Sequence, residues 1–177
     1  MIYFTADTHF FHSNIIGMAN RPFHSVEEMN EALIQNWNAK VSDNDDIFVL
    51  GDFSLKGPTL ANAVLEQLRG RKYLIRGNHD RYVDKSSFQR DLFVWINDYF
   101  ELCWQRQYFI LCHYPLLSWN GMYRGSLHLH GHCHNKMEYN LANLAAGVRR
   151  LDIGADAFGM TPVSIEEILA FFGDGEK

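Results

Sequence analysis

Five short segments of this chain carry carboxylate, amide or imidazole side chains at points where a predicted strand runs into a loop. These segments are Asp7-Thr8-His9, Gly51-Asp52-Phe53, Gly77-Asn78-His79-Asp80, His113 and Gly131-His132-Cys133-His134. Divalent ions of intermediate hardness accept such oxygen and nitrogen ligands, whereas structural zinc sites more often recruit several thiolates. The pattern therefore predicts a catalytic site that holds two divalent metal ions.

The elements that must position these side chains can be read from capping signals and apolar periodicity. Ser25-Val26-Glu27-Glu28 has the form of a capping box and predicts a helix to about Lys40, and Ser164 is expected to cap a terminal helix. Pro58 and Gly70 are expected to bracket a further helix. The remaining predicted elements are a helix near residues 87–97 and strands at residues 2–6, 47–50, 73–75, 99–104, 108–112, 127–130 and 150–153.

The two halves of the chain favour different strand arrangements. The first half alternates apolar strands with helices, which is typical of parallel sheets, and residues 99–104 and 108–112 predict an antiparallel hairpin. We therefore expect an α/β fold in which two mixed β-sheets pack together and helices flank them, an αββα sandwich. A single domain over residues 1–177 is expected. Ligands bind at the carboxyl ends of strands in such sheets, so the ligand-bearing loops should converge there.

Composition limits the partners that the chain can have. With 47% hydrophobic residues it can bury a sizeable core, and its formal net charge of −5 does not favour a broad basic surface for long nucleic acid. Small anionic substrates stay compatible with this charge, because two bound divalent cations would dominate the local field. The net charge therefore does not exclude a small phosphate-containing substrate, and the oligomeric state is left open.

Cysteine usage and hydropathy indicate the compartment. Cys103, Cys112 and Cys133 form no CxxC pair, which fits a reduced compartment better than a disulfide framework. The first residues have no basic and apolar leader pattern, and no apolar run reaches roughly 18 residues. A cytoplasmic protein without membrane insertion is therefore expected.

The ordered motifs Asp-x-His, Gly-Asp, Gly-Asn-His-Asp, His and Gly-His-x-His resemble those of the calcineurin-like metallophosphoesterase superfamily. Each motif is weakly specific alone, but five in this order between residues 7 and 134 are not expected by chance. The flanking segments resemble a group of small bacterial and phage phosphoesterases. They are residues 7–16, 20–23 and 162–167.

The resemblance implies a binuclear metal centre and assigns its ligands. The implied ligands are Asp7, His9 and His134 for the first ion, Asn78, His113 and His132 for the second, and Asp52 as the bridge. A bridging carboxylate can hold two ions about 3.5–4 Å apart, and coordination lowers the pKa of water from about 15.7 towards 7. The resemblance thus implies attack of a metal hydroxide on phosphorus. Manganese, iron, zinc and nickel all suit these ligands, with manganese favoured.

Further residues are expected around the metals. His79 resembles the family's non-ligand histidine, which stabilises phosphoryl charge or protonates the leaving oxygen, and Asp80 would orient its ring. His12 and Arg21 could reach a substrate phosphate, although each could equally be structural.

Other histidines and aromatic residues have simpler interpretations. His128 and His130 are expected to be structural or to support ligands, because the family spacing favours the two histidines that follow Gly131. Among the aromatic residues, Trp119 and Tyr123 are the expected pocket walls.

The leading functional hypothesis is a metal-dependent phosphodiesterase that acts on a small, nucleotide-like substrate. The rival is a phosphomonoesterase, including a protein phosphatase. Asp52 is followed by Phe53 rather than by the Asp-Arg-Gly element of serine/threonine phosphatases, and Asp80 stands where those enzymes have Glu, which lowers the odds of a protein phosphatase. A third hypothesis is a noncatalytic module that uses metals to hold phosphate.

Overall fold

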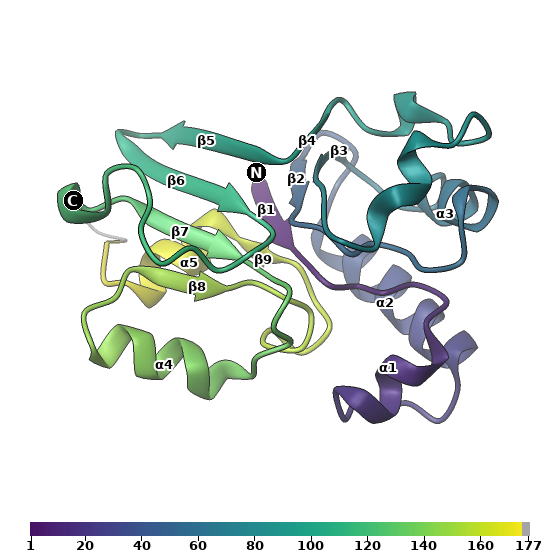
Figure 1. The fold of residues 1–177 in the computed structure, drawn as a ribbon, viewed down its shortest axis with the longest axis horizontal. Coiled ribbons are helices and arrows are strands. Elements are labelled where there is room, and N and C mark those ends of the chain that lie inside the picture. The colour runs from purple at the N-terminus through teal and green to yellow at the C-terminus, as the bar shows by residue number, and fades with distance from the viewer. Residues whose placement is uncertain (175–177) are drawn as a thin grey trace.

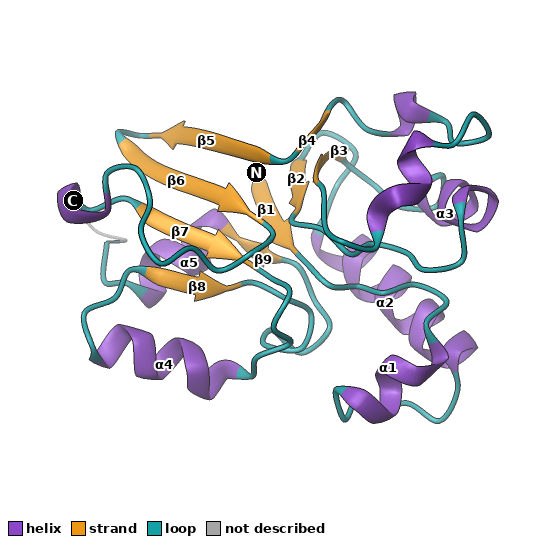
Figure 2. Ribbon diagram, viewed as in Figure 1, coloured by secondary structure: helices purple, strands orange, loops and turns teal. Residues whose placement is uncertain are grey.

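The strands of the chain form two sheets, seen in the computed structural model that describes residues 1–174 (Figures 1 and 2). The first sheet has the order β4-β3-β2-β1-β9 and the second β5-β6-β7-β8. The strands of the first sheet are β1 (Ile2–Thr5), β2 (Asp46–Val49), β3 (Arg71–Ile75), β4 (Ile96–Asn97) and β9 (Val163–Ser164). Those of the second are β5 (Tyr99–Trp104), β6 (Gln107–Cys112), β7 (Leu127–His130) and β8 (Arg150–Asp152).

Both sheets are mixed, as expected. Strands β1 to β4 are parallel to one another, and β9 pairs antiparallel with β1. In the second sheet β5 and β6 form the expected antiparallel hairpin, whereas β6, β7 and β8 are parallel. The arrowheads of β6, β7 and β8 in Figure 2 point the same way, so their carboxyl ends lie at one edge.

An apolar core joins the inner faces of the two sheets. It contains Phe4 and Phe48 from the first sheet together with Phe109, Leu129 and Leu151 from the second, all buried. The ring centroids of Phe4 and Phe109 lie 6.1 Å apart across the interface. Phe109 and Leu111 of β6 belong to this core, and Ile110 between them is buried as well, so this strand is covered on both faces near its centre. The αββα prediction is confirmed.

Helices pack around the two sheets. They are α1 (Ser13–Met18), α2 (Val26–Lys40), α3 (Pro58–Leu65), α4 (Met137–Ala145) and α5 (Ile165–Phe171). Helix α5 packs against the core between the sheets, to which it contributes Ile165, Ile168 and Leu169. Ser25 caps α2, and Ser164 forms a complete capping box with Glu167 at the start of α5, as its sequence predicts. Met29 and Trp37 of α2 share a second core with the outer face of the first sheet. Helix α4, which we did not expect, lies beside β8 (Figure 1).

The prediction of a helix near residues 87–97 is wrong. This segment contains only a 3₁₀ turn at Arg90–Leu92 before β4 at Ile96–Asn97. Phe93 is buried and Val94 is exposed, which is the alternation of a strand edge. The backbone also pairs with β3, since Val94 N donates to Lys72 O at 2.8 Å. The aromatic and β-branched residues of this segment therefore pair as a strand with β3 and do not form a helix.

The two sheets meet where β1 and β8 end. Ala6 forms a parallel bridge with Gly154, and Ala155 N donates to Ala6 O at 2.9 Å. Asp7 N donates to Gly51 O at 3.0 Å on the other side. The loop after β1 is thus held between the loops that follow β2 and β8, which brings segments from both sheets together.

Among residues 1–174, no helix is both long enough and apolar enough to cross a membrane.

Candidate metal centre

Two groups of ligand-type side chains lie at the carboxyl ends of the strands. Within each group, one donor atom from every residue lies within 4.8 Å of the others. The groups are Asp7, His9 and His134, and Asp52, His113 and His132. Asn78 adjoins the second group, because its Oδ1 lies 3.2 Å from His113 Nε2. The structure therefore brings together the seven side chains that the motifs single out.

Asp52 lies between the two groups. Its Oδ2 is 3.4 Å from Nε2 of His113 in the second group and 3.7 Å from Nε2 of His9 in the first. Its Oδ1 accepts a hydrogen bond of 2.8 Å from His79 N, which fixes the carboxylate. One oxygen thus faces both groups, which is the placement that a bridging ligand needs.

Hydrogen bonds orient two of the imidazoles. The Nδ1–H of His113 donates to Leu50 O at 2.8 Å, and that of His134 donates to Asp156 Oδ2 at 2.8 Å. A bond at Nδ1 sets the tautomer and leaves Nε2 with a free lone pair, as in metal-ligating histidines. Each ring is therefore preset to offer Nε2 towards its group.

Five of the seven candidate ligand residues have an unusual backbone conformation. Their φ values are left-handed: Asp7 (54°), His9 (51°), Asp52 (53°), His132 (72°) and His134 (51°). Such angles are uncommon for residues other than glycine and cost of order 1–3 kcal/mol each. Their concentration at one place indicates that the fold maintains this geometry for function.

Glycines in the motifs make room for neighbouring ligands. A Cβ at Gly77 would overlap the Asp52 carboxylate, and a Cβ at Gly131 would overlap Asp7 Oδ2. Asp7 Oδ2 also accepts a hydrogen bond of 2.8 Å from His132 N, next to Gly131. The glycine in each motif thus lets a ligand from a different strand approach the backbone.

The first group contains buried polar atoms without partners. Among the described residues, Asp7 Oδ1 and His9 Nε2 have no hydrogen bond. Burial raises the pKa of Asp7 to about 7, and burial together with His134 lowers the pKa of His9 to about 3. A buried carboxylate and a neutral imidazole with an unused lone pair are complementary to a cation. The donor set therefore fits a divalent metal ion.

The prediction that Asp80 orients the His79 ring is wrong. Asp80 is fully buried, whereas the His79 side chain is 42% exposed. The Asp80 carboxylate accepts hydrogen bonds from the backbone N–H groups of Asp52, Phe53 and Gly77 at 2.8, 3.0 and 2.8 Å. Asp80 therefore joins the loops after β2 and β3 and acts on the site through the position of Asp52.

Arg21 does not reach a substrate phosphate, contrary to one of its two expected roles. It is 4% exposed, and its guanidinium donates to Asp156 and to the carbonyl oxygens of Asp7 and Thr8. The Nη2–Asp7 O distance is 2.6 Å. Its five donors are directed into the protein, so Arg21 holds the left-handed turn that presents Asp7 and His9.

His12 and His79 line the side of the first group. The ring centroid of His9 lies 5.2 Å from that of His12 and 5.4 Å from that of His79. His12 Nδ1 lies 3.3 Å from His9 Nδ1. Both rings are thus close enough to act on a molecule that is held at the metal centre.

Sequence reasoning missed Asp156. Its carboxylate is buried between His134, Arg21 and Lys136, with bonds of 2.8, 2.9 and 3.3 Å. Burial alone would raise the pKa of Asp156, but the bonds from His134 and Arg21 hold it below its usual range. Asp156 lies 22 residues beyond His134. The one sequence signal that could have marked it, an acidic side chain among apolar residues, is shared with Asp152.

We expect Asp156→Asn to weaken metal binding at the first group by about 10- to 100-fold, as losses of outer partners of ligating histidines do. The substitution removes the negative charge that His134 Nδ1–H faces. Isothermal titration of the metal-stripped variant with Mn²⁺ measures the change. Glu138→Gln, at an exposed carboxylate of α4, is the matched control; equal affinities in both variants would contradict the role of Asp156.

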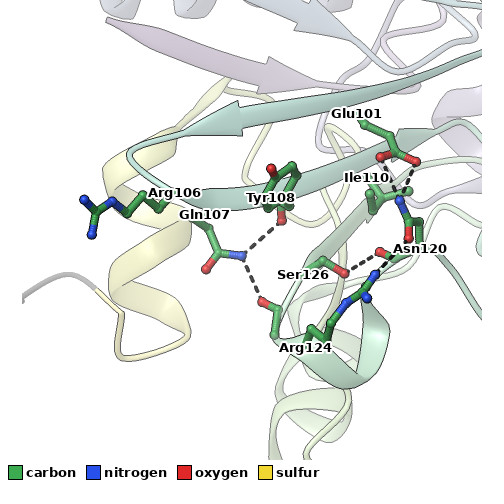
Figure 3. A pocket seen from close by; sticks show the side chains of 10 residues that line it. Glu101, Arg106, Gln107, Tyr108, Ile110, Asn120, Arg124 and Ser126 are labelled. Carbon is green, nitrogen blue, oxygen red and sulfur yellow. Dashed lines mark hydrogen bonds between the residues drawn. The ribbon is translucent and has the colours of Figure 1, made fainter.

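A separate cavity lies at the other end of β6. It has a volume of about 420 Å³, and Figure 3 shows its lining on the hairpin and on the turn around Arg124. Its polar groups pair mainly with one another, since Asn120 Nδ2 donates to Glu101 Oε2 at 2.9 Å and Gln107 Nε2 to Gly125 O at 2.9 Å. This cavity contains none of the ligand-type residues of the metal centre.

Similarity to known proteins agrees with the fold and the site. Residues 1–158 match the calcineurin-like phosphoesterase family. An uncharacterized protein of Methanocaldococcus jannaschii is 35% identical over 178 residues, which cover 99% of this chain and 93% of that protein. The gene 66 protein of Mycobacterium phage L5 is 26% identical, with coverage of 94% and 91%.

A solved structure has the same architecture. The crystal structure of a protein of unknown function from Aquifex aeolicus superposes with a TM-score of 0.75 at 25% identity, covering 95% of this chain and 97% of that one. The fold and the two groups of aspartate and histidine are those of a metal-dependent phosphoesterase. The chain belongs to the calcineurin-like phosphoesterase family.

Proposed function

We propose that this chain is an enzyme that hydrolyses a small phosphodiester, with nucleotide-like compounds as its substrate class, at a centre of two divalent ions. The position of Asp52 carries the proposal. One of its oxygens lies 3.7 Å from His9 and 3.4 Å from His113, so a single carboxylate adjoins both ligand groups. Two cations at such a centre grip phosphate oxygens and lower the pKa of water towards 7.

The ligand roles follow from this arrangement. Asp7, His9 and His134 would hold one ion, Asn78, His113 and His132 the other, and Asp52 both. These mixed oxygen and imidazole donors suit manganese, which we favour, and also iron, zinc and nickel.

The remaining residues act on the substrate or on the ligands. His79 is 42% exposed, and its Nε2 lies 4.0 Å from Asp52 Oδ2, so the ring faces the place where a phosphate would be held. We assign it the stabilisation of phosphoryl charge or the protonation of the leaving oxygen. His12, beside His9, is a second group within reach of the substrate. Asp80, Asp156 and Arg21 fix the ligands and touch no substrate.

Phosphomonoesterase activity is the second candidate, because His79 can serve either reaction. A phosphoprotein substrate is less favoured, since the segment after Asp52 lacks the Asp-Arg-Gly element. A noncatalytic phosphate-binding module is disfavoured, because Asp52, Asn78 and His79 are all present and adjacent. The free cysteines Cys103, Cys112 and Cys133 suit the cytoplasm, which we propose as its compartment.

The proposal is tested with metal-stripped protein that is supplied with Mn²⁺. We expect faster hydrolysis of bis(p-nitrophenyl) phosphate than of p-nitrophenyl phosphate, and no hydrolysis without metal. A preference for the monoester would favour the second candidate. Binding of Mn²⁺ without turnover of either ester would favour the noncatalytic module.

A further inference from the structure

An exposed aromatic ring lies beside the second ligand group. Tyr114 follows His113 directly and is 44% exposed. Its ring centroid lies 5.0 Å from that of His113 and 4.7 Å from that of His132, both nearly edge to face. A large amphipathic side chain is thus available to a ligand at the edge of the proposed metal centre, where a phosphate ester would extend from the ions.

The loop that carries Tyr114 is anchored to the second sheet. His128 Nδ1–H donates to Ile110 O at 3.0 Å, which leaves its Nε2 to accept a bond of 3.0 Å from Leu116 N. Arg150 Nη1 donates to Leu116 O at 3.0 Å. Both backbone groups of Leu116 are therefore held, two residues beyond Tyr114. Burial lowers the pKa of His128 to about 4, which keeps its Nε2 an acceptor at neutral pH.

This anchoring also settles the role of His128, which is structural as expected. The backbone two residues beyond Tyr114 is thus held before a ligand arrives, and a tyrosine side chain has few torsions to restrict on binding. Tyr114 is therefore suited to recognition, because ordering its side chain costs little conformational freedom.

The aromatic residues expected to form pocket walls do not have this position. Trp119 is 9% exposed, and its Nε1 donates to Ser126 Oγ at 3.0 Å inside the loop. Tyr123 is 93% exposed on the 3₁₀ turn Met122–Arg124, where it lines a small cavity of about 230 Å³ together with Trp119. Trp119 and Tyr123 are thus walls of a cavity, as expected, but none of the ligand-type residues of the metal centre lines it. Tyr114 is the aromatic residue that adjoins the ligands.

The two sides of the centre differ in chemistry. His12 and His79 lie near His9 of the first group, whereas Tyr114 lies near His113 and His132 of the second. A diester held between the groups has two ester arms. The imidazole side suits a polar, charge-developing oxygen, and the tyrosine side suits a flat, apolar arm. A nucleobase is such an arm, since every base has a face that stacks on an aromatic ring.

We propose that Tyr114 determines substrate specificity by stacking on the base of a nucleotide-type phosphoester. The proposal rests on the proposed function, and it assigns a residue and a subsite to the substrate class. The ring supplies the contact, so Tyr114→Phe should keep it and Tyr114→Leu should lose it. Tyr123→Leu is the matched control, because it removes an exposed tyrosine from the same loop.

The kinetic test compares two diesters with the same leaving group, in Mn²⁺. They are the p-nitrophenyl ester of thymidine 5′-monophosphate and methyl p-nitrophenyl phosphate. We expect Tyr114→Leu to lower kcat/KM for the thymidine ester by about 5- to 100-fold, the range that loss of one base stack produces. The methyl ester should be hydrolysed as by the wild type. Equal losses on both diesters, or a loss in Tyr114→Phe matching that in Tyr114→Leu, would overturn the proposal.

A binding test separates this proposal from the proposed function. Isothermal titration in Mn²⁺ compares thymidine 5′-monophosphate with 2-deoxyribose 5-phosphate, which lacks the base. The wild type and Tyr123→Leu should prefer the nucleotide, and Tyr114→Leu should lose the preference. If the wild type hydrolyses neither diester, the proposed function fails. The preference for the nucleotide over the base-free phosphate would still show whether Tyr114 stacks on the base. No preference in the wild type would overturn the role of Tyr114.

Discussion

Asp52→Asn is expected to abolish turnover and to reduce metal occupancy at both ligand groups together. Asp52 Oδ2 lies near His9 in the first group and near His113 in the second. An amide carries no charge and bridges cations poorly, so both ions lose a ligand from one substitution. The loss of activity should exceed the roughly 10- to 100-fold that outer partners of metal ligands contribute.

The variant should still fold. Asn at position 52 has nearly the same shape, and its Oδ1 can accept the bond that His79 N now donates at 2.8 Å. The measurement is metal content by mass spectrometry after loading with Mn²⁺, together with kcat/KM on bis(p-nitrophenyl) phosphate and the melting temperature. Asp98→Asn makes the same chemical change on a carboxylate that is 86% exposed. Full metal content or full activity in Asp52→Asn would refute the bridging role.

The positions of the ligand loops could be predicted from the sequence because the signals are local. Each apolar strand is followed within a few residues by its donors, and parallel strands end at one edge. The structure places Asp7, Asp52 and His113 there, with the remaining candidates around them. The capping residues Ser25 and Ser164 were equally local and were confirmed.

The supporting interactions could not be predicted, because they join distant parts of the chain. Arg21 and Asp156 pair across 135 residues, and nothing near either residue identifies its partner. The sequence therefore left Arg21 with two possible roles, substrate contact or structural pairing, whereas its burial and its bond to Asp7 O show the structural one. Asp80 was misjudged for the same reason, since its partners are backbone groups on the loops after two strands.

A second expected result concerns His79, for which catalysis and metal binding should separate. We expect His79→Ala to lower kcat by about 100- to 10,000-fold, the usual contribution of a positioned acid or base. Metal content should not change, because the contact that His79 makes with Asp52 Oδ1 comes from its backbone N–H, which alanine retains. The side chain is 42% exposed, so its removal leaves no buried cavity.

Leaving-group dependence tells which role His79 has. If the ring protonates the leaving oxygen, His79→Ala should harm an alkyl ester more than a p-nitrophenyl ester, because p-nitrophenolate departs without a proton. If the ring only stabilises phosphoryl charge, both esters should lose activity equally. His24→Ala, at an exposed histidine before α2, is the matched control. Loss of Mn²⁺ from His79→Ala would instead make His79 a ligand, and unchanged kcat on both esters would exclude it from catalysis.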